Sequence, residues 1–567
     1  MGRASRWYFT LFWCLVVFPR PARAQWAPNG NGLCVLAGDQ SYPVIATDGG
    51  GGAFVVWADD RSGPSADLYL QHITSSGAIV AGWTANGNPL CTVANDQRSP
   101  ATVSDGAGGV YVTWEDDRAG AGSSDIYLQR ITSSGAVAAG WPVNGLAVCT
   151  AVDVQASPVI ALESGAAIVA WQDGRSTSSN DIYAQKVSAA GVPQWTADGV
   201  AVCTAAGGQT QPAIVGDNAG GALVVWQDTR AGITANVYVQ RLNASGIPQW
   251  TAGGASVCSA SNDQINAHAI ADAAGGAIVV WDDYRSGNGN IYAQRMSGSG
   301  VAQWAANGVA LCTDVSEQFS APLVSDGAGG AIVPWSDFRL GTGSLYAQKI
   351  SAAGVVGWQA DGAPICAAGD ISDPVAAPDG TGGAFFVWDD ARAGGLGVDL
   401  YAVRFTSAGA LGVGWTSGGS LICNAAGNQL RPVVTMDATG SVITSWFDDR
   451  NTNYDVFAKR LALGGSTVDV PPASLAGLAL SAAPNPMVTG TMLRFTLDVR
   501  EPARLEILDL GGRVVRVVLD DRALPAGPAS IGWDGREASG ASAPAGLYWA
   551  RLATPSRTEV RKLARLR

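Results

Sequence analysis

The sequence predicts an all-β protein in which an eight-bladed β-propeller is followed by a small C-terminal β-sandwich. First, the pattern W-x-D-x-R occurs eight times, at spacings of 53 to 58 residues. Second, the segments around it are short, rich in Val, Ile, Tyr and Trp, and bounded by Gly, Asp and Ser, which is typical of strands and turns. Third, this repetition stops before residue 471 and gives way to a different pattern of short strands.

The first 24 residues have the pattern of a secretory signal peptide. Arg3 and Arg6 precede an apolar run over residues 7–18, and A-R-A at 22–24 resembles a cleavage site. The apolar run is too short to span a bilayer, and no later segment reaches that length. We therefore expect residues 1–24 to be removed and the mature chain to be secreted or held at the outer cell surface, without a membrane span.

Each repeat has room for the four strands of a propeller blade. A strand usually opened by Pro and closed by Asp (43–48) leads through a Gly-Gly turn into the apolar run that ends in Trp (276–281). An alternating strand (181–186) and a Trp…Cys segment (304–312) complete the unit. No segment of the repeats has a convincing 3.6-residue period, so helices are not expected.

The two ends of the array predict that the ring closes. The last repeat ends at residue 460 without its Trp…Cys segment, and that segment lies instead at residues 26–34. The first strand of the mature chain can therefore complete the last blade, which removes the open sheet edges of an array. We assign residues 25–465 to the propeller; two smaller propellers or an open array are the alternatives.

The charge distribution argues against some partners. The chain has a net charge of −12, and residues 25–470 carry −20 once the four signal-peptide arginines and the tail, at +4, are set aside. A segment with so large a negative charge repels phosphate groups. We therefore expect neither a nucleic-acid partner nor an anionic lipid.

Eight cysteines occur once per repeat, and a disulfide framework is the obvious alternative to a packing role. Equivalent outer-strand positions in neighbouring blades are about 15 Å apart when strands are spaced as in a sheet, which is too far for a bridge. We expect buried, free thiols and, by the same reasoning from repetition, two core tryptophans per repeat. The cysteines are Cys34, Cys91, Cys149, Cys203, Cys258, Cys312, Cys366 and Cys423.

The Asp and Arg of W-x-D-x-R have two interpretations. Asp can accept the N–H groups of a turn and pair with the Arg, which is a structural role. Alternatively, the repeated carboxylates form a ligand face for Ca²⁺ or sugar hydroxyls, and Ca²⁺ is the one cofactor left open. The candidate ligand face comprises Asp59, Arg61, Asp116, Arg118, Asp173, Arg175, Asp228, Arg230, Asp283, Arg285, Asp337, Arg339, Asp390, Arg392, Asp448 and Arg450. The glutamines expected on the same face are Gln40, Gln97, Gln155, Gln209, Gln264, Gln318 and Gln429, with Ile371 in the remaining repeat.

The sequence offers no catalytic constellation. His72 and His268 are in different repeats and have no metal-ligand partner at a useful spacing, which disfavours a zinc site and a Ser-His-Asp triad. No phosphate-binding loop or G-x-S-x-G motif is present. Departures from the repeat, such as Glu163, Phe319 and Pro334, have the character of tolerated variation. We predict no catalytic residue and no metal site.

The tail carries an ordered set of motifs. These are P-N-P at 484–486, L-x-I-x-D-L-x-G-R at 505–513, L-P-A-G at 524–527, W-D-G-R at 533–536 and P-A-G-L-Y at 544–548. They resemble the C-terminal sorting domains of type IX secretion cargo, and equally the immunoglobulin-like domain of flagellar hook-capping proteins. The resemblance implies an immunoglobulin-like sandwich over 481–567, after a linker at 466–480, that engages a secretion machinery; a fixed accessory domain is the alternative.

Together these features favour an exported, non-enzymatic propeller that binds a glycan or an extracellular protein. One alternative is a glycan-active hydrolase or lyase whose loop residues the repeats conceal. Another is a structural component of the cell surface.

Overall fold

The computed structural model describes residues 26–464, except 121, 177–178, 368–369 and 393–396, and residues 480–566, except 484, 486, 498–500, 510–512, 525–526 and 555–557. The predicted signal peptide and nearly all of the predicted linker lie outside the described residues. The chain forms two compact units, 1–465 and 466–567, which we treat separately. Within the described residues no helix is long and apolar enough to cross a membrane.

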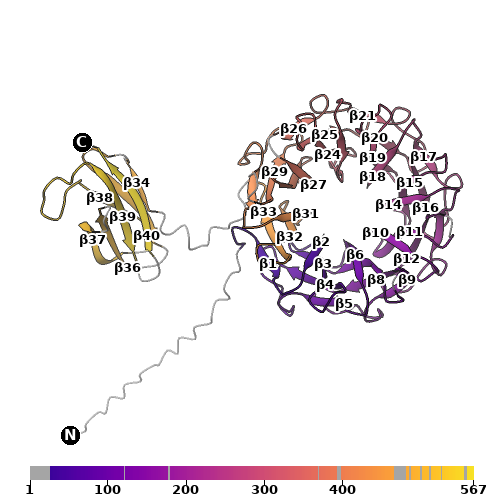
Figure 1. Cartoon of the computed structure of the whole chain (residues 1–567), viewed down its shortest axis with the longest axis horizontal. Helices are drawn as coiled ribbons and strands as arrows, with labels where there is room; N and C mark the ends of the chain where they lie inside the picture. Colours follow the sequence, from indigo (N-terminus) through magenta and orange to yellow (C-terminus); the bar gives the residue numbers. More distant parts are fainter. Residues whose placement is uncertain are drawn as a thin grey trace, which may run out of the picture. The chain divides into compact units, whose positions relative to one another are not determined.

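In the first unit, the described residues form eight antiparallel sheets around a central opening (Figure 1). We number the sheets 1 to 8 along the chain, starting from the sheet that contains β2. Sheet 1 contains β2 (Gln40–Thr47), β3 (Ala53–Asp59), β4 (Asp67–Ile73) and β5 (Asn88–Cys91). Sheet 2 contains β6 (Gln97–Ser104), β7 (Val110–Asp116), β8 (Asp125–Ile131) and β9 (Leu146–Cys149). Sheet 3 contains β10 (Gln155–Glu163), β11 (Ala166–Asp173), β12 (Asp181–Val187) and β13 (Val200–Cys203), and sheet 4 contains β14 (Gln209–Gly216), β15 (Ala222–Asp228), β16 (Asn236–Leu242) and β17 (Ala255–Cys258). Sheet 5 contains β18 (Gln264–Ala271), β19 (Ala277–Asp283), β20 (Asn290–Met296) and β21 (Val309–Cys312). Sheet 6 contains β22 (Gln318–Ser320), β23 (Val324–Ser325), β24 (Ala331–Asp337), β25 (Ser344–Ile350) and β26 (Ala363–Cys366). Sheet 7 contains β27 (Ile371–Pro378), β28 (Ala384–Asp390), β29 (Asp399–Phe405) and β30 (Ser420–Cys423). Sheet 8 is β31 (Gln429–Met436), β32 (Val442–Asp448), β33 (Asp455–Leu461) and β1 (Asn31–Cys34).

This arrangement confirms the all-β prediction and the repeated four-stranded sheets of a propeller-like fold. The first strand of each sheet lies nearest the opening and the last lies outermost (Figure 1). In sheet 6, β22 and β23 both pair with β24 and together take the place of the first strand. The second strand is buried along its whole length, as in β3 and β15, because neighbouring sheets cover both of its faces. That burial explains why the apolar runs into Trp are continuous instead of alternating.

The two ends of the repeat array meet in sheet 8. β1 pairs antiparallel with β33, with Asn31 opposite Ala458 and Cys34 opposite Val456. Trp26 is buried between sheets 8 and 1, and its indole N–H donates to the backbone oxygen of Ser75 at 3.0 Å. The N-terminal segment therefore contributes both the outer strand of sheet 8 and a contact with sheet 1.

The eight cysteines of the first unit are free and buried, as expected from the spacing argument. Burial raises the pKa of the Cys149 thiol to about 12, so this group is a neutral packing residue at ordinary pH.

The second unit contains two sheets within its described residues, in the orders β34-β35-β38 and β37-β36-β39-β40. Leu493, Phe495, Leu505, Ile507 and Leu552 from the two sheets share one apolar core. The strands are β34 (Ser481–Ala483), β35 (Thr491–Leu497), β36 (Glu501–Leu508), β37 (Val514–Leu524), β38 (Gly527–Trp533), β39 (Gly546–Ala553) and β40 (Thr558–Arg565).

A tryptophan substitution tests whether the ring is closed in solution. We expect Trp26→Ala to lower the free energy of unfolding by about 3–5 kcal/mol, because it leaves a cavity and removes a hydrogen bond. Chemical denaturation followed by tryptophan fluorescence measures this loss. Trp83→Ala is the matched control, since Trp83 makes the equivalent contact to Ser133, at 2.9 Å, between sheets 1 and 2. A loss for Trp83→Ala alone would show an open array.

Candidate functional site

The aspartate of W-x-D-x-R is buried and fully engaged, as Asp116 illustrates. Its Oδ2 accepts the indole N–H of Trp114 at 2.7 Å, and its Oδ1 accepts the backbone N–H of Arg118 at 3.0 Å. The Arg118 side chain donates to both oxygens, at 2.8 and 2.6 Å, and its guanidinium lies 3.7 Å from the centroid of the Tyr127 ring. The ion pair is therefore enclosed between two aromatic side chains.

This ion pair also joins two sheets. Arg118 contacts the sulfur of Cys91 in sheet 1 at 3.3 Å and the backbone oxygen of Asn144 in sheet 2 at 2.7 Å. Gly145, with φ at 92°, lies against Trp114 so closely that a Cβ would be 2.3 Å from the ring. We call this arrangement of Trp, Asp, Arg and Cys the sheet lock.

All sixteen residues of the candidate ligand face occupy equivalent positions in the eight sheet locks. Every one of the eight aspartates is 0% exposed, and the arginine side chains are 16–24% exposed. The carboxylate oxygens face groups of the protein itself, so they are closed to an external ligand. Of the two interpretations that the sequence allows, the geometry favours the structural one.

The seven glutamines expected on the same face are also buried. Gln40 donates its amide to the backbone oxygen of Gly38 at 2.8 Å, and the other six glutamines make similar contacts. Their Oε1 atoms are buried and have no hydrogen-bond partner among the described residues. They belong to the interior of the loops and do not form a surface.

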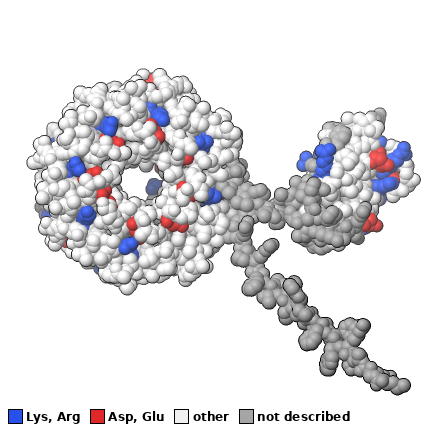
Figure 2. All heavy atoms as spheres, turned by 180° about the vertical axis from the view of Figure 1, so that it is seen from behind, with Lys and Arg blue, Asp and Glu red and all other residues white. Residues whose placement is uncertain are grey.

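At the other end of the inner strands, a second ion pair recurs. Asp105 accepts the N–H groups of Ala107 and Gly109, both at 2.7 Å, and pairs with Arg130 at 2.8 Å. Figure 2 shows a face on which acidic side chains surround the opening with basic side chains outside them, which is the arrangement that such pairs produce.

Glu163 stands in for this aspartate in sheet 3, and its departure from the repeat has a structural use. Its carboxylate accepts the N–H groups of Asn218 and Gly220 in sheet 4, at 3.1 and 3.0 Å. The interpretation of Glu163 as mere variation is therefore too simple.

The residues that surround the opening on the sheet-lock face are not among those that the repeat pattern predicts as a site. There the inner strand is bulged in every sheet but sheet 6, and one non-glycine residue in each of these seven bulges has a left-handed backbone, as in Tyr42, whose φ is 52°. Such a conformation costs roughly 1–2 kcal/mol for a residue with a Cβ. The bulge residues are Tyr42, Ser99, Ser157, Gln211, Asn266, Asp373 and Arg431.

The bulge positions carry residues with side chains, although glycine would adopt the same backbone conformation without strain. The chain has 73 glycines, yet none occupies a bulge position. Strain of this kind is typical of functional sites. Six residue types occupy the seven bulge positions, whereas the neighbouring Asp repeats in all sheets and the neighbouring Gln in all but one.

A pocket of about 560 Å³ lies at one side of this opening, and we call it the mouth pocket. Tyr42, Arg98, Ser99, Asp373 and Arg431 line it together with prolines and valines. Tyr42 is 53% exposed, and the Arg431 guanidinium lies 4.9 Å from the centroid of its ring. Arg431 also faces Asp373, with 3.7 Å between Nε and Oδ2.

The distribution of cations singles out this pocket. Eighteen Lys and Arg lie between residues 26 and 464. Eight are in sheet locks, seven occupy the Arg130 position, and Lys459 is buried against the backbone oxygens of Pro28 and Ile422. The remaining two are Arg98 and Arg431, and both line the mouth pocket.

The residue between Trp and Asp of the motif also varies, and in three sheets it is acidic. These carboxylates accept a backbone N–H from the bulge region of the next sheet: Ser157 to Glu115 (2.8 Å), Ser320 to Asp282 (2.7 Å) and Arg431 to Asp389 (3.3 Å). The sequence signal for these three acids was that the position between the repeated Trp and the repeated Asp varies from one repeat to the next.

Two of these buried acids hold their protons more tightly than usual. Burial raises the pKa of Asp282 to about 7. Burial, followed by the negative charge of Asp373, raises the pKa of Asp389 to about 6. Asp389, which accepts the backbone N–H of Arg431, is therefore a carboxyl with a raised pKa next to a residue of the mouth pocket.

A channel of about 720 Å³ runs along the axis. Residues from the inner edges of all eight sheets line it, mostly Val, Ile, Pro and Ala. Its polar side chains are Thr102, Gln211, Asn266 and His268. Burial lowers the pKa of His268 to about 4, so the imidazole is neutral at pH 7.

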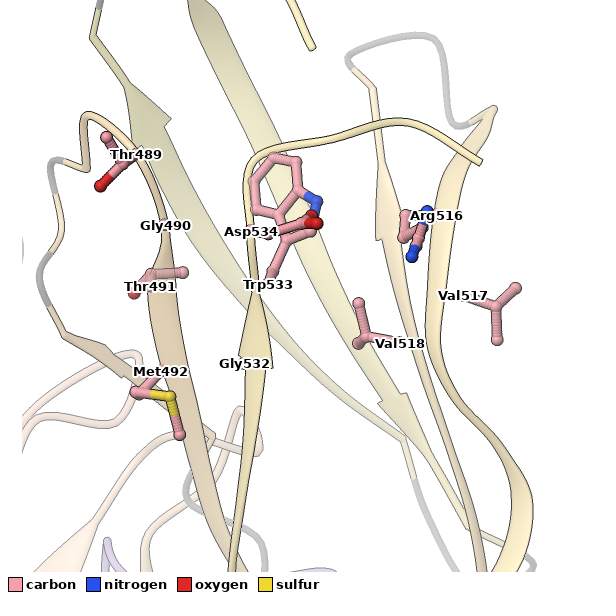
Figure 3. Close-up of a pocket in the computed structure, with 10 residues that line it drawn as sticks. All are labelled: Thr489, Gly490, Thr491, Met492, Arg516, Val517, Val518, Gly532, Trp533 and Asp534. Atoms are coloured by element: carbon pink, nitrogen blue, oxygen red, sulfur yellow. The ribbon is translucent and has the colours of Figure 1, made fainter. Parts of the chain in front are cut away.

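The second unit has its own pocket, of about 570 Å³ (Figure 3). Trp533 and Asp534 at the end of β38 lie across from Arg516 and Val518 of β37. Asp534 and Arg516 are its charged side chains. Across the described residues of both units, no group of three His, Cys, Asp or Glu is placed to hold a metal ion.

No protein-family model matches the chain, and no curated protein matches it. Among solved structures, ulvan lyase, a polysaccharide lyase, is 9% identical over 77% of this chain and 94% of its own, with a TM-score of 0.40. A puromycin-hydrolysing peptidase of Mycobacterium tuberculosis is 12% identical over 75% of this chain and 62% of its own, with a TM-score of 0.37. An endo-arabinase of Bacteroides thetaiotaomicron is 11% identical over 42% of this chain and 89% of its own, with a TM-score of 0.28.

A substitution in one sheet lock tests its structural role. We expect Asp116→Asn to lower the free energy of unfolding by about 3 kcal/mol, because it leaves the Arg118 charge enclosed without its partner. Urea denaturation measures the change. Asp370→Asn, at an exposed aspartate, is the control and should be neutral. Equal stability of the two variants would contradict the sheet lock.

Proposed function

We propose that this protein is an exported eight-bladed β-propeller that binds a neutral glycan in the mouth pocket. The observation that carries the proposal is the grouping of the exposed Tyr42 with Arg431 and Asp373. An exposed aromatic ring packs against the apolar face of a sugar, while charged planar groups form directional hydrogen bonds with its hydroxyls. A few polar groups in an otherwise apolar pocket are typical of small-molecule sites.

The local charge supports a neutral ligand over an anionic one. Arg98 lies 3.2 Å from Glu115, and it also pairs with Asp117. Arg431 faces Asp373, and residues 25–470 as a whole carry −20. An anionic ligand would meet these acidic surroundings with little uncompensated positive charge.

A second candidate function is cleavage of the same glycan by hydrolysis or elimination. Asp389 favours it, because a carboxyl whose pKa is raised by burial is a typical proton donor. Asp389 is 1% exposed, so it would act only after a rearrangement of the mouth. The non-enzymatic interpretation remains our first choice for that reason.

The address of the protein is part of the proposal. The signal-like residues 1–24 support export, and the motif order of the tail supports an immunoglobulin-like sorting domain that engages a secretion machinery. The two sheets of the second unit, which share one core, are compatible with that domain type.

Substitutions in the mouth pocket test the proposed binding. The mature protein is passed over a panel of neutral and acidic polysaccharides, with Ca²⁺ or with a chelator, and retention and released fragments are measured. We expect retention by a neutral polysaccharide, a loss of at least about tenfold in affinity for Tyr42→Ala and Arg431→Ala, and no effect of the chelator.

Ile233→Ala is the matched control, since Ile233 is 99% exposed and remote in sequence from the mouth pocket residues. Released fragments that disappear in Asp389→Asn would favour the second candidate function. Retention that both Tyr42→Ala and Arg431→Ala preserve would place the binding site elsewhere and refute the proposal.

A truncation tests the address. We expect a chain that ends at residue 470 to remain in the periplasm of its native host, while the full chain reaches the cell exterior, because the tail would be the recognised segment. Cell fractionation and immunoblotting measure the distribution. Equal export of both chains would make the tail a fixed accessory domain.

A further inference from the structure

We propose that the mouth pocket and the axial channel form one continuous site, which receives the end of a linear neutral glycan chain. This inference rests on the proposed function and adds to it: recognition would be of chain ends, not of chain interiors.

The two cavities share part of their walls. Val44, Pro100 and Val433 line both the mouth pocket and the channel. These residues come from the inner strands of sheets 1, 2 and 8, and each follows Tyr42, Arg98 or Arg431 in the same strand. The mouth pocket therefore adjoins the channel at these three residues, where a ligand seated on Tyr42 would continue inward.

The channel suits a neutral, hydroxyl-rich chain. None of its lining residues is Asp, Glu, Lys or Arg, so no charged side chain of the lining loses water when the channel is filled. Its polar side chains are uncharged and only partly used by the protein. Thr102 donates its hydroxyl to the Tyr111 backbone oxygen, Gln211 accepts at Oε1 from Gln227, and Asn266 donates Nδ2 to Asp282 and Ser320. The hydroxyl oxygen of Thr102, the Nε2 of Gln211, the Oδ1 of Asn266 and the neutral imidazole of His268 are left to meet a ligand. Among the described residues, the imidazole of His268 makes no hydrogen bond that would compete with a ligand, and its backbone pairs with Val280 in the sheet.

The backbone adds further hydrogen-bonding groups. Each inner strand lies at one end of its sheet order, so one of its edges pairs with no other strand among the described residues. Such an edge presents free N–H and C=O groups, and here the edges face the axis. Sugar hydroxyls, which both donate and accept, match this lining.

The dimensions agree with an end-on ligand. A volume of about 720 Å³ lies within the range of roughly 300–1,000 Å³ that is typical of ligand sites. The mouth pocket involves residues of sheets 1, 2, 7 and 8 alone, so the chain would enter from one side of the opening and turn along the axis.

Channel-filling variants test this inference. Ala269 and Val159 line the channel but not the mouth pocket. Binding of the full mature chain and of its Ala269→Trp and Val159→Trp variants is measured by calorimetry. The probes are disaccharides and linear hexasaccharides of glucose, xylose, mannose, arabinose and galactose.

For the sugar that binds, we expect either tryptophan variant to weaken the hexasaccharide by about tenfold or more and to leave the disaccharide unchanged. Tyr42→Ala should weaken both. Thermal unfolding shows whether each variant is folded. Because two channel positions are substituted, the test still works if one of the two variants does not fold.

A second probe needs no variant. Hexasaccharides that carry a bulky aromatic label at both ends should bind the unmodified protein about tenfold or more weakly than the free hexasaccharides. Undiminished binding of the doubly labelled chains, or of free hexasaccharides to both tryptophan variants, would overturn the end-on inference while leaving the mouth pocket intact. If Tyr42→Ala binds both the disaccharide and the hexasaccharide as tightly as the unmodified protein does, the proposed function is refuted instead.

Discussion

The first unit depends on one buried ion pair that recurs at every boundary between sheets. An aspartate without exposed surface is stable in the interior only because Arg, Trp and a backbone N–H satisfy its oxygens. The arginine in turn contacts the sulfur of the preceding sheet, so the same pair closes a turn and joins two sheets. Repeated eight times, this contact fixes the relative position of the sheets, and the strained residues of the opening are supported by that frame.

The repeated residues were predictable because repetition itself carries the information. The spacing of Trp and Asp indicated four short strands per unit, and the displaced Trp…Cys segment indicated where the chain ends meet. The partners of Asp116 were partly predictable too, since Arg118 is two residues away. Cys91, which lies in another sheet, was not, because its contact arises only when the sheets pack together.

The mouth pocket escaped prediction for a physical reason. A bulge with a left-handed residue leaves almost no mark in the sequence when the residue is Tyr or Arg instead of Gly. Its side chains differ between sheets, so repetition, the strongest signal in this chain, directs attention away from them. In a protein built from repeats, a variable position that lies between two repeated positions is therefore the better place to look for a binding site.

The pairing of β1 with β33 joins residues more than 400 positions apart, such as Asn31 and Ala458. Contacts of such long sequence separation form late, because the chain between them must first be ordered. The earliest strand of the ring to be synthesised is therefore the last to find its partner. Until then sheet 8 keeps an open edge, and a chaperone that shields this edge would be most useful in the interval between synthesis and closure.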